Sequence, residues 1–201
     1  MLSEKLEAAL NHQINEEFYS SYLYLSMAGW FEDKNLDGCA HWMEMQAEEE
    51  WQHGMKIFRY LVDRGGRVTL KEIKAPPTDW DTVKAAFEAA FEHEKFMTRN
   101  INVLAELAIN EKDYATNNLM QWYIAEQVEE EAQVDDILTQ VAQDIREDPA
   151  YADIPFDTLI QILQQLNLAM IDQKRVDRAQ QLAEEADLPP SLIPELEFLT
   201  N

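Results

Sequence analysis

The residues best suited to chemistry form one acid-rich set that occurs twice along the chain. Two triplets have internal spacings of 33 and then 3 residues and begin 77 residues apart: Glu17, Glu50 and His53, then Glu94, Gln127 and Glu130. Residues three apart share one face of a helix, and two such faces meeting in a bundle core would surround a pair of metal ions with oxygen donors and one imidazole. The sequence therefore predicts a two-metal site built by two similar halves.

The surroundings of these residues favour the core over a solvated face. Apolar residues such as Ile57 flank Glu50 and His53 at helical spacing, and apolar residues also flank Glu17 and Glu94. A Glu-x-x-His pair arises by chance in any Glu-rich helix, and a solvated face or a salt bridge to a nearby Lys or Arg is the alternative. Because buried acids without basic partners need a metal, we favour metal binding.

A third, all-carboxylate position is a further candidate beside the first two. Glu49 and Glu126 are equivalent under the same 77-residue offset, and Glu129 lies in the same acidic run as Glu126. A solvated acidic face explains these three residues equally well. Oxygen-rich ligation suits hard cations and favours ferric iron, so iron is the expected metal, with manganese and zinc as alternatives.

Positioning these ligands requires long helices, and the sequence predicts four. Apolar residues recur at intervals of three and four over residues 2–33, 36–64, 82–110 and 113–146. Only 5 glycines and 7 prolines occur, which favours an all-α protein without sheet. Two of the breaks are short and imply antiparallel neighbours, whereas residues 65–81 can span the whole bundle if extended. We expect two antiparallel hairpins joined by one long crossover, so that the second and third helices run parallel.

The chain divides into a bundle and a C-terminal part of different character. Residues 1–147 are expected to form the four-helix bundle, and Pro149 and Pro155 interrupt the pattern that follows. A short apolar fifth helix is expected within 148–170. Residues 171–201 are expected to form an additional helical extension, whose role the sequence does not identify beyond packing on the surface.

Charge and cysteine content limit the partners and the compartment. The formal net charge of −23 argues against a nucleic-acid partner, since phosphate backbones need a basic surface, and it makes cations the natural partners. No run is long and apolar enough to span a membrane, and the N-terminus lacks the layout of a signal peptide. Cys39, the single cysteine, cannot form an internal disulfide, so a reducing, cytoplasmic location is expected.

These motifs together resemble those of bacterial non-haem ferritins in the ferritin-like di-iron superfamily, over about residues 1–165. The resemblance is carried by Glu17 after Asn15 and Glu16, Tyr24, Glu49-Glu50-x-x-His53, Glu94, and Gln127-x-Glu129-Glu130 after Gln121, Trp122 and Tyr123. It implies a ferritin-like four-helix bundle. It also implies a ferroxidase that oxidises Fe(II) with O2 or H2O2 and stores ferric oxyhydroxide inside a homo-oligomeric cage of 24 subunits.

The resemblance also implies a role for each site residue. The first iron would be held by Glu17, Glu50 and His53, and the second by Glu94 and Glu130, with Gln127 nearby and Glu50 bridging. A third, transit site would consist of Glu49, Glu126, Glu129 and Glu130. Tyr24 matches a tyrosine that can supply an electron to the di-iron centre. Trp122, one turn before Glu126, is a second redox candidate, although we favour a packing role for its indole.

Two departures from related patterns have consequences. Gln127 and Glu130 stand where a symmetric pattern would have Glu and His, so the second iron should be held loosely. Haem-binding relatives place a Met where this chain has Trp51 and Gln52, so no haem is expected. Two other functions remain open: a soluble di-iron oxidase or peroxidase of small oligomeric state with the same ligands, and an acidic helical scaffold that buffers metal passively.

Overall fold

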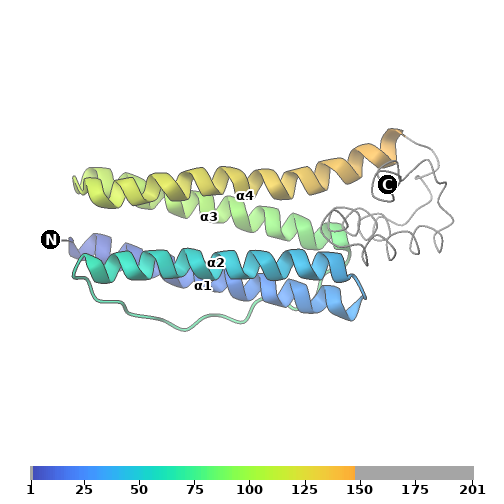
Figure 1. Ribbon diagram of the computed structural model, residues 1–201, viewed down its shortest axis with the longest axis horizontal. Coiled ribbons are helices and arrows are strands. Elements are labelled where there is room, and N and C mark those ends of the chain that lie inside the picture. The colour runs from blue at the N-terminus through green and yellow to red at the C-terminus, as the bar shows by residue number, and fades with distance from the viewer. Residues whose placement is uncertain (1, 148–201) are drawn as a thin grey trace, which may run out of the picture.

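Four long helices make up the fold in a computed structural model of the protein, which describes residues 2–147 (Figure 1). They are α1 (Glu4–Asp33), α2 (Asp37–Asp63), α3 (Val83–Asn110) and α4 (Tyr114–Glu147). The described part of the chain contains no strand, so the all-α prediction and the four predicted segments are confirmed. None of these helices is both long and apolar enough to cross a membrane. The predicted fifth helix within 148–170 and the extension over 171–201 lie outside the described residues.

The first three helices end in the same kind of left-handed turn. The residues at these turns have positive φ angles: 57° at Asn35, 73° at Gly65 and 56° at Lys112. In each turn the next residue donates its backbone N–H to the carbonyl five residues earlier, as from Leu36 to Phe31 at 3.0 Å. Such bonds satisfy carbonyls left free at a helix end and redirect the chain sharply. They explain why the turns after α1 and α3 need so few residues.

The connection between α2 and α3 runs along the length of α1, as its extended reach predicts. Near its start, Asn11 of α1 donates its side-chain N–H to the carbonyl of Arg67 at 2.9 Å. Near its end, the indole N–H of Trp30 donates to Asp79 Oδ1, also at 2.9 Å. The segment thereby returns the chain to the end of the bundle from which α2 started. Figure 1 shows that α2 and α3 consequently run in the same direction, so the predicted crossover topology is confirmed.

Two apolar clusters fill the bundle and leave a polar layer between them. The Phe31 cluster includes Tyr24, Met27, Phe31, Met43 and Phe87, and the buried Cys39 also lies in it. The Leu10 cluster includes Leu10, Ile14, Ile57, Leu104 and Tyr123. The layer between the two clusters contains four buried acids: Glu17, Glu50, Glu94 and Glu130. Burying ionised carboxylates is costly, so this layer needs a chemical explanation.

Candidate metal centre

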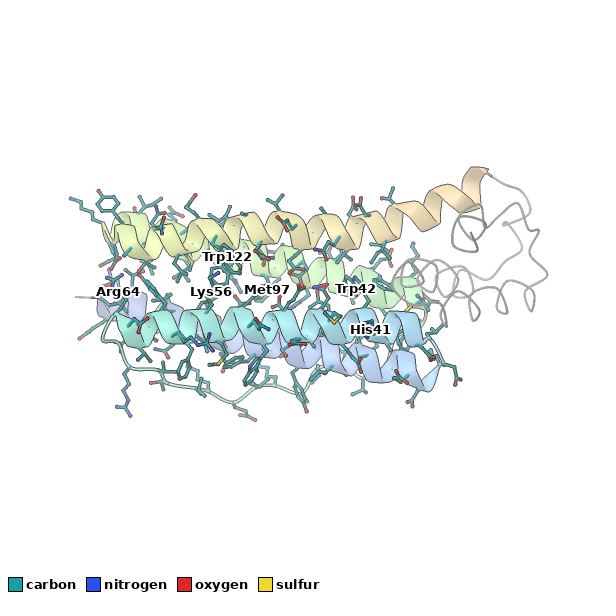
Figure 2. All side chains as sticks on the ribbon, in the orientation of Figure 1. His41, Trp42, Lys56, Arg64, Met97 and Trp122 are labelled. Carbon is teal, nitrogen blue, oxygen red and sulfur yellow. The ribbon has the colours of Figure 1, made fainter. Side chains whose placement is uncertain are left out.

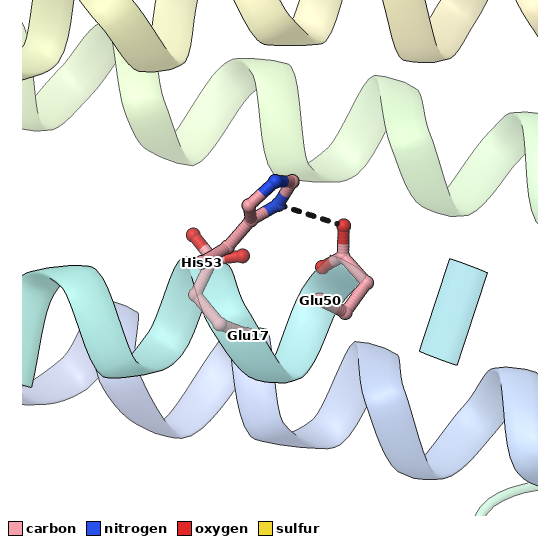
Figure 3. A group of neighbouring side chains, drawn as sticks. All are labelled: Glu17, Glu50 and His53. Atoms are coloured by element: carbon pink, nitrogen blue, oxygen red, sulfur yellow. Dashed lines mark hydrogen bonds and ion pairs between the residues drawn. The ribbon is translucent and has the colours of Figure 1, made fainter. Parts of the chain in front are cut away.

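Three of the predicted ligands meet inside the first hairpin. Figure 3 shows Glu17 of α1 converging on Glu50 and His53 of α2. One possible ligand atom from each lies within 4.8 Å of the other two, and all three side chains are buried. His53 Nδ1 lies 3.1 Å from Glu50 Oε1. The three-residue spacing from Glu50 to His53 therefore brings both side chains to one point, where the antiparallel neighbour α1 supplies the third.

The carboxyl group of Glu50 has an incomplete set of partners. Its Oε2 atom is buried and has no hydrogen-bond partner among the described residues. Burial, together with the nearby carboxylates of Glu94 and Glu130, raises the pKa of Glu50 well above its ordinary value. Burial and the Glu50 carboxylate likewise raise the pKa of Glu17. A hard cation between these oxygens would supply the missing partner and offset the repulsion, so the donor set fits a metal ion such as iron.

The predicted second set of ligands lies on the opposite hairpin. Glu94 of α3 is fully buried, and it accepts a hydrogen bond on Oε1 from the hydroxyl of Tyr24. Gln127 of α4 donates its amide N–H to Glu94 Oε2 at 3.1 Å. Glu130, one helical turn after Gln127, is also buried, and burial together with the Glu94 carboxylate raises its pKa to about 8. Gln127 thus presents its amide nitrogen to Glu94.

The internal repeat of the sequence has a structural counterpart. In the first hairpin, Glu17 and Glu50 bring carboxylate oxygens within 4.8 Å of each other. In the second hairpin, the residues at the same offset, Glu94 and Gln127, share a hydrogen bond. Each hairpin therefore contributes one acid from its first helix and one oxygen-bearing side chain from its second, facing the other hairpin across the polar layer.

A third group of potential ligand atoms, formed by His53, Glu126 and Glu130, connects the two hairpins. His53, Glu126 and Glu130 each offer one atom within 4.8 Å of the others. Two members of the predicted third site, Glu126 and Glu130, are therefore brought together with His53, which was assigned only to the first iron. Glu129 is exposed, and the metal-binding groups found among the described residues do not include it.

Buried glutamines hold several of these carboxylates in place. Gln13 Nε2 donates to Glu17 Oε1 at 2.9 Å. Gln46 Nε2 lies 3.0 Å from Glu49 Oε2 and 3.2 Å from Glu130 Oε2, so it joins Glu49 to the centre indirectly. Sequence reasoning does not single out Gln13 or Gln46. The available signal was their position on the ligand face, four residues before Glu17 and Glu50 respectively.

A histidine that the sequence reasoning also passed over helps to fix the redox candidate Tyr24. His93 Nε2 lies 2.7 Å from Ser20 Oγ, which ties α3 to α1 beside the centre. The His93 ring packs edge-on against Tyr24, with ring centroids 6.4 Å apart. Its position directly before Glu94 was the only signal for it. The Tyr24 ring is therefore held between a packed imidazole on one side and the carboxylate of Glu94 at its hydroxyl.

An open groove of about 700 Å³ lies over α2 and α4 and reaches the edge of the centre at His53. Trp122 lines this groove, and its ring packs edge-on against His53 with centroids 5.4 Å apart. Lys56 lies on the Trp122 ring, with Nζ 2.9 Å from the ring centroid. Figure 2 labels both residues between the two helices. Trp122 thus packs between His53 and Lys56 at the edge of the groove.

The crossover-linked four-helix bundle and its buried carboxylate and imidazole donors define the ferritin-like class of proteins. Residues 7–143 match the Ferritin-like domain family, and the chain belongs to this family. It is 41% identical over 141 residues to the bacterial non-heme ferritin of Bacteroides fragilis (strain 638R), which covers 70% of this chain and 89% of the relative.

Further comparisons extend the similarity to archaea. Over 132 residues the chain is 42% identical to the bacterial non-heme ferritin of Campylobacter jejuni, covering 66% of this chain and 79% of the relative. The crystal structure of an open pore ferritin from Archaeoglobus fulgidus matches with a TM-score of 0.71 and 48% identity, covering 80% of this chain and 96% of that one. The expected resemblance to bacterial non-haem ferritins is therefore confirmed.

Proposed function

We propose that this chain is the subunit of an iron-storage ferritin that oxidises Fe(II) to Fe(III) inside its own helix bundle. The observation that carries the proposal is the buried acidic layer, in which Glu50 Oε2 has no hydrogen-bond partner among the described residues. Family membership supports it, because relatives in this family are named ferritins. The formal net charge of −23 also supports it, because an acidic surface raises the local concentration of cations.

Two Fe(II) ions are the substrates at the centre. The first would bind Glu17, Glu50 and His53, and the second Glu94 and Glu130, with Glu50 bridging and Gln127 nearby. When O2 is the oxidant, two electrons from two Fe(II) ions and two protons reduce it to H2O2. When H2O2 is the oxidant, two electrons from two Fe(II) ions and two protons reduce it to two waters. The raised pKa of Glu130, about 8, means that this carboxyl is mainly protonated at neutral pH and releases its proton as iron binds.

Tyr24 is the proposed source of an additional electron. Its hydroxyl donates to Glu94, which places the phenol one hydrogen bond from a ligand of the second iron. A Tyr24→Phe variant should keep the ligands and the fold but lose any transient tyrosyl radical signal during oxidation. An unchanged radical signal in that variant would move the role to another side chain, such as Trp122.

The third group of ligand atoms suggests how ferric product leaves the centre. His53 and Glu130 line both the buried centre and the group that includes Glu126, and the groove begins at His53. We infer that ferric iron passes through this group to a mineral of ferric oxyhydroxide enclosed by a shell of 24 subunits. The Archaeoglobus fulgidus relative is described as an open pore ferritin.

Aerobic titration of Fe(II) into the apo-protein, followed by size-exclusion chromatography with iron analysis, tests the function. Iron far above two or three per chain in a very large particle supports storage. Uptake that stops at two per chain in a small particle would mean a soluble di-iron oxidase or peroxidase.

Two ligand variants and a matched control test catalysis itself. Glu50→Ala and His53→Ala should abolish rapid oxidation, whereas Glu44→Ala, which removes an exposed acid of the same helix, should leave it intact. Oxidation that is unchanged in both ligand variants would mean that the chain buffers metal passively.

A further inference from the structure

The groove over α2 and α4 contains a cation supplied by the protein itself. Lys56 of α2 and Trp122 of α4 point toward each other between these helices (Figure 2). The ammonium nitrogen lies 2.9 Å from the centroid of the indole, which is a close cation–π contact. Lys56 is only half-buried, and it lines the groove together with His53 and Glu49. A positive charge therefore stands at the point where the groove meets the ligand groups.

This ammonium group lies beside the group of ligand atoms formed by His53, Glu126 and Glu130, because the Trp122 ring contacts both Lys56 and His53. Partial burial lowers the pKa of Lys56, and the Glu126 carboxylate opposes that shift. None of the ion pairs found in the described part of the chain includes Lys56, so its ammonium is not fixed in a salt bridge. The ring that it contacts belongs to Trp122, one helical turn before Glu126 on α4. The Glu126 carboxylate can therefore attract either the ammonium or a metal ion that enters the group.

We propose that Lys56 is a displaceable counter-ion that weakens metal binding at the His53, Glu126 and Glu130 group. The ammonium compensates Glu126 while the group holds no metal ion, and an incoming ion must push it off the Trp122 ring. This inference rests on the proposed function, because it concerns the position through which ferric iron would leave the centre. A cation tethered beside a transit position shortens the stay of iron there, which favours passage over retention.

The groove gives the displaced side chain somewhere to go. Lysine carries its charge on a flexible four-carbon stem, so the head group can move without moving the helix. Glu48, Glu49 and Asp63 also line the groove and offer other carboxylates to a displaced ammonium. Displacement therefore breaks the cation–π contact and weakens the attraction to Glu126. The displaced ammonium can still pair with the carboxylates that line the groove.

Zinc binding to the assembled apo-protein tests the proposal with a redox-inert ion. Isothermal titration of Zn²⁺ is compared among the wild type and the Lys56→Met, Lys56→Arg and Arg59→Met variants. Glu126→Ala identifies which binding step belongs to the third group. Lys56→Met keeps the stem but removes the charge. Arg59→Met is the matched control, because Arg59 lines the same groove, is exposed and makes none of the observed cation–π contacts of the described residues.

We expect Lys56→Met to bind the ion assigned to the third group about tenfold more tightly, because removal of a nearby like charge is worth on the order of one factor of ten. Lys56→Arg and Arg59→Met should stay close to the wild type. Trp122 provides a second readout that a merely structural role would not move. The fluorescence of Trp122 is obtained by subtracting the spectrum of Trp122→Phe from that of the wild type. This fluorescence should change when zinc fills the third group, and it should not change in Lys56→Met.

Three outcomes would overturn the proposal: an unchanged third affinity in Lys56→Met, an equal gain in Arg59→Met, or no third zinc step in any variant. Its failure is distinguishable from failure of the proposed function, since rapid oxidation of two Fe(II) per chain is measured on the same proteins. If that oxidation persists while Lys56→Met has no effect, only the role of Lys56 is wrong. If oxidation is absent from the wild type, the ferroxidase itself is wrong.

Discussion

The amide of Gln127 donates a hydrogen bond to Glu94, with Nε2 lying 3.1 Å from Oε2. The same nitrogen also lies 3.2 Å from the backbone carbonyl oxygen of Glu94. An ionised carboxylate at position 127 could donate neither bond and would repel Glu94. The neutral amide therefore stabilises the buried Glu94 without adding charge, which lets this half of the centre form before metal binds.

Gln127→Glu should lower the stability of the apo-protein and raise its affinity for metal. We expect the apo-protein to lose about 1–3 kcal/mol, because a buried acceptor loses its donor, while chelators remove the second metal ion more slowly. Denaturation of the apo- and zinc-loaded proteins and chelator-release kinetics measure the two effects. Gln133→Glu makes the same change at an exposed site on α4 and should alter neither. An apo-protein of wild-type stability would contradict this account of Gln127.

Gly54 allows α1 and α2 to approach closely beside the first ligands. A Cβ atom at this position would lie 2.6 Å from Phe18 Cε1 and 3.3 Å from Glu17 Cβ. The Phe18 ring is buried and stacked on Trp51 with centroids 4.6 Å apart, so it has little room to move. Gly54→Ala should therefore shift Glu17 and slow iron oxidation.

In Gly54→Ala, overpacking should cost about 1–3 kcal/mol, against a gain of roughly 1 kcal/mol from the better helix propensity of Ala. Gly29→Ala is the matched control, because Gly29 is an exposed helical glycine with no atom within 4 Å of its added Cβ. It should raise the thermal midpoint and leave oxidation unchanged. Equal behaviour of the two variants would show that close packing at Gly54 is unimportant.

The raised pKa of Glu130 predicts how the stability of the apo-protein depends on pH. The pKa rises from the ordinary 4.5 to about 8 in the folded state, first because of burial and then because of Glu94. Between these values the folded chain keeps a proton that the unfolded chain has released. Stability is therefore greatest below the ordinary pKa and is lost as pH rises through the folded one. Glu130 alone should lower it by about 1.4 kcal/mol per pH unit across this window.

Urea denaturation of the apo-protein from about pH 5 to about pH 8 measures this slope, because the folded and unfolded chains differ in protonation over this range. Glu130→Gln should flatten it, whereas Glu129→Gln, at the exposed neighbouring position, should not. Saturating zinc should reverse the trend, because metal binds the ionised form of the carboxyl group. Identical slopes in the wild type and Glu130→Gln would assign the pH dependence to other groups.

Arg64 and Asp113 join the two hairpins at the end of the bundle. Two parallel hydrogen bonds connect them, from Nη1 to Oδ1 at 2.9 Å and from Nη2 to Oδ2 at 2.6 Å. Asp113 Oδ1 also accepts the backbone N–H of Thr116 at 3.0 Å, which caps α4. The hydrogen bonds from Arg64 lower the pKa of Asp113 from 3.8 to about 2. The stability that this carboxylate contributes is thus lost only as pH falls through that range.

Asp113→Asn should keep the cap but lose the charge pairing, with a cost of about 1–3 kcal/mol. Arg64→Lys should recover part of that cost at most, because lysine cannot bind both oxygens in parallel. Thermal denaturation measures both changes. Lys84→Met breaks the exposed pair with Glu88 and should have little effect. A larger loss in Lys84→Met than in Asp113→Asn would refute the importance of this connection.

The sequence predicted the elements and the meeting of Glu17, Glu50 and His53, because helix periodicity and antiparallel pairing determine both. Glu50 and His53 share a helix face through their spacing alone, and the length of the segment after Gly65 allowed only a few paths for the chain. Which acids join which group depends on side-chain rotamers and on contacts between distant helices. For that reason Glu129 was grouped with Glu126 although the structure places it at the surface, and the contact between Lys56 and Trp122 was not foreseen.

The polar layer between the two apolar clusters has a consequence for the life of the protein in a cell. Four buried acids cost folding free energy, and metal ions that bind only the folded chain would return it by mass action. Proteases act on the small fraction of chains that has opened, and that fraction grows as folding free energy falls. If this layer binds iron as proposed, subunits made when iron is scarce should be degraded sooner than loaded ones, and the amount of the protein would then follow the iron supply.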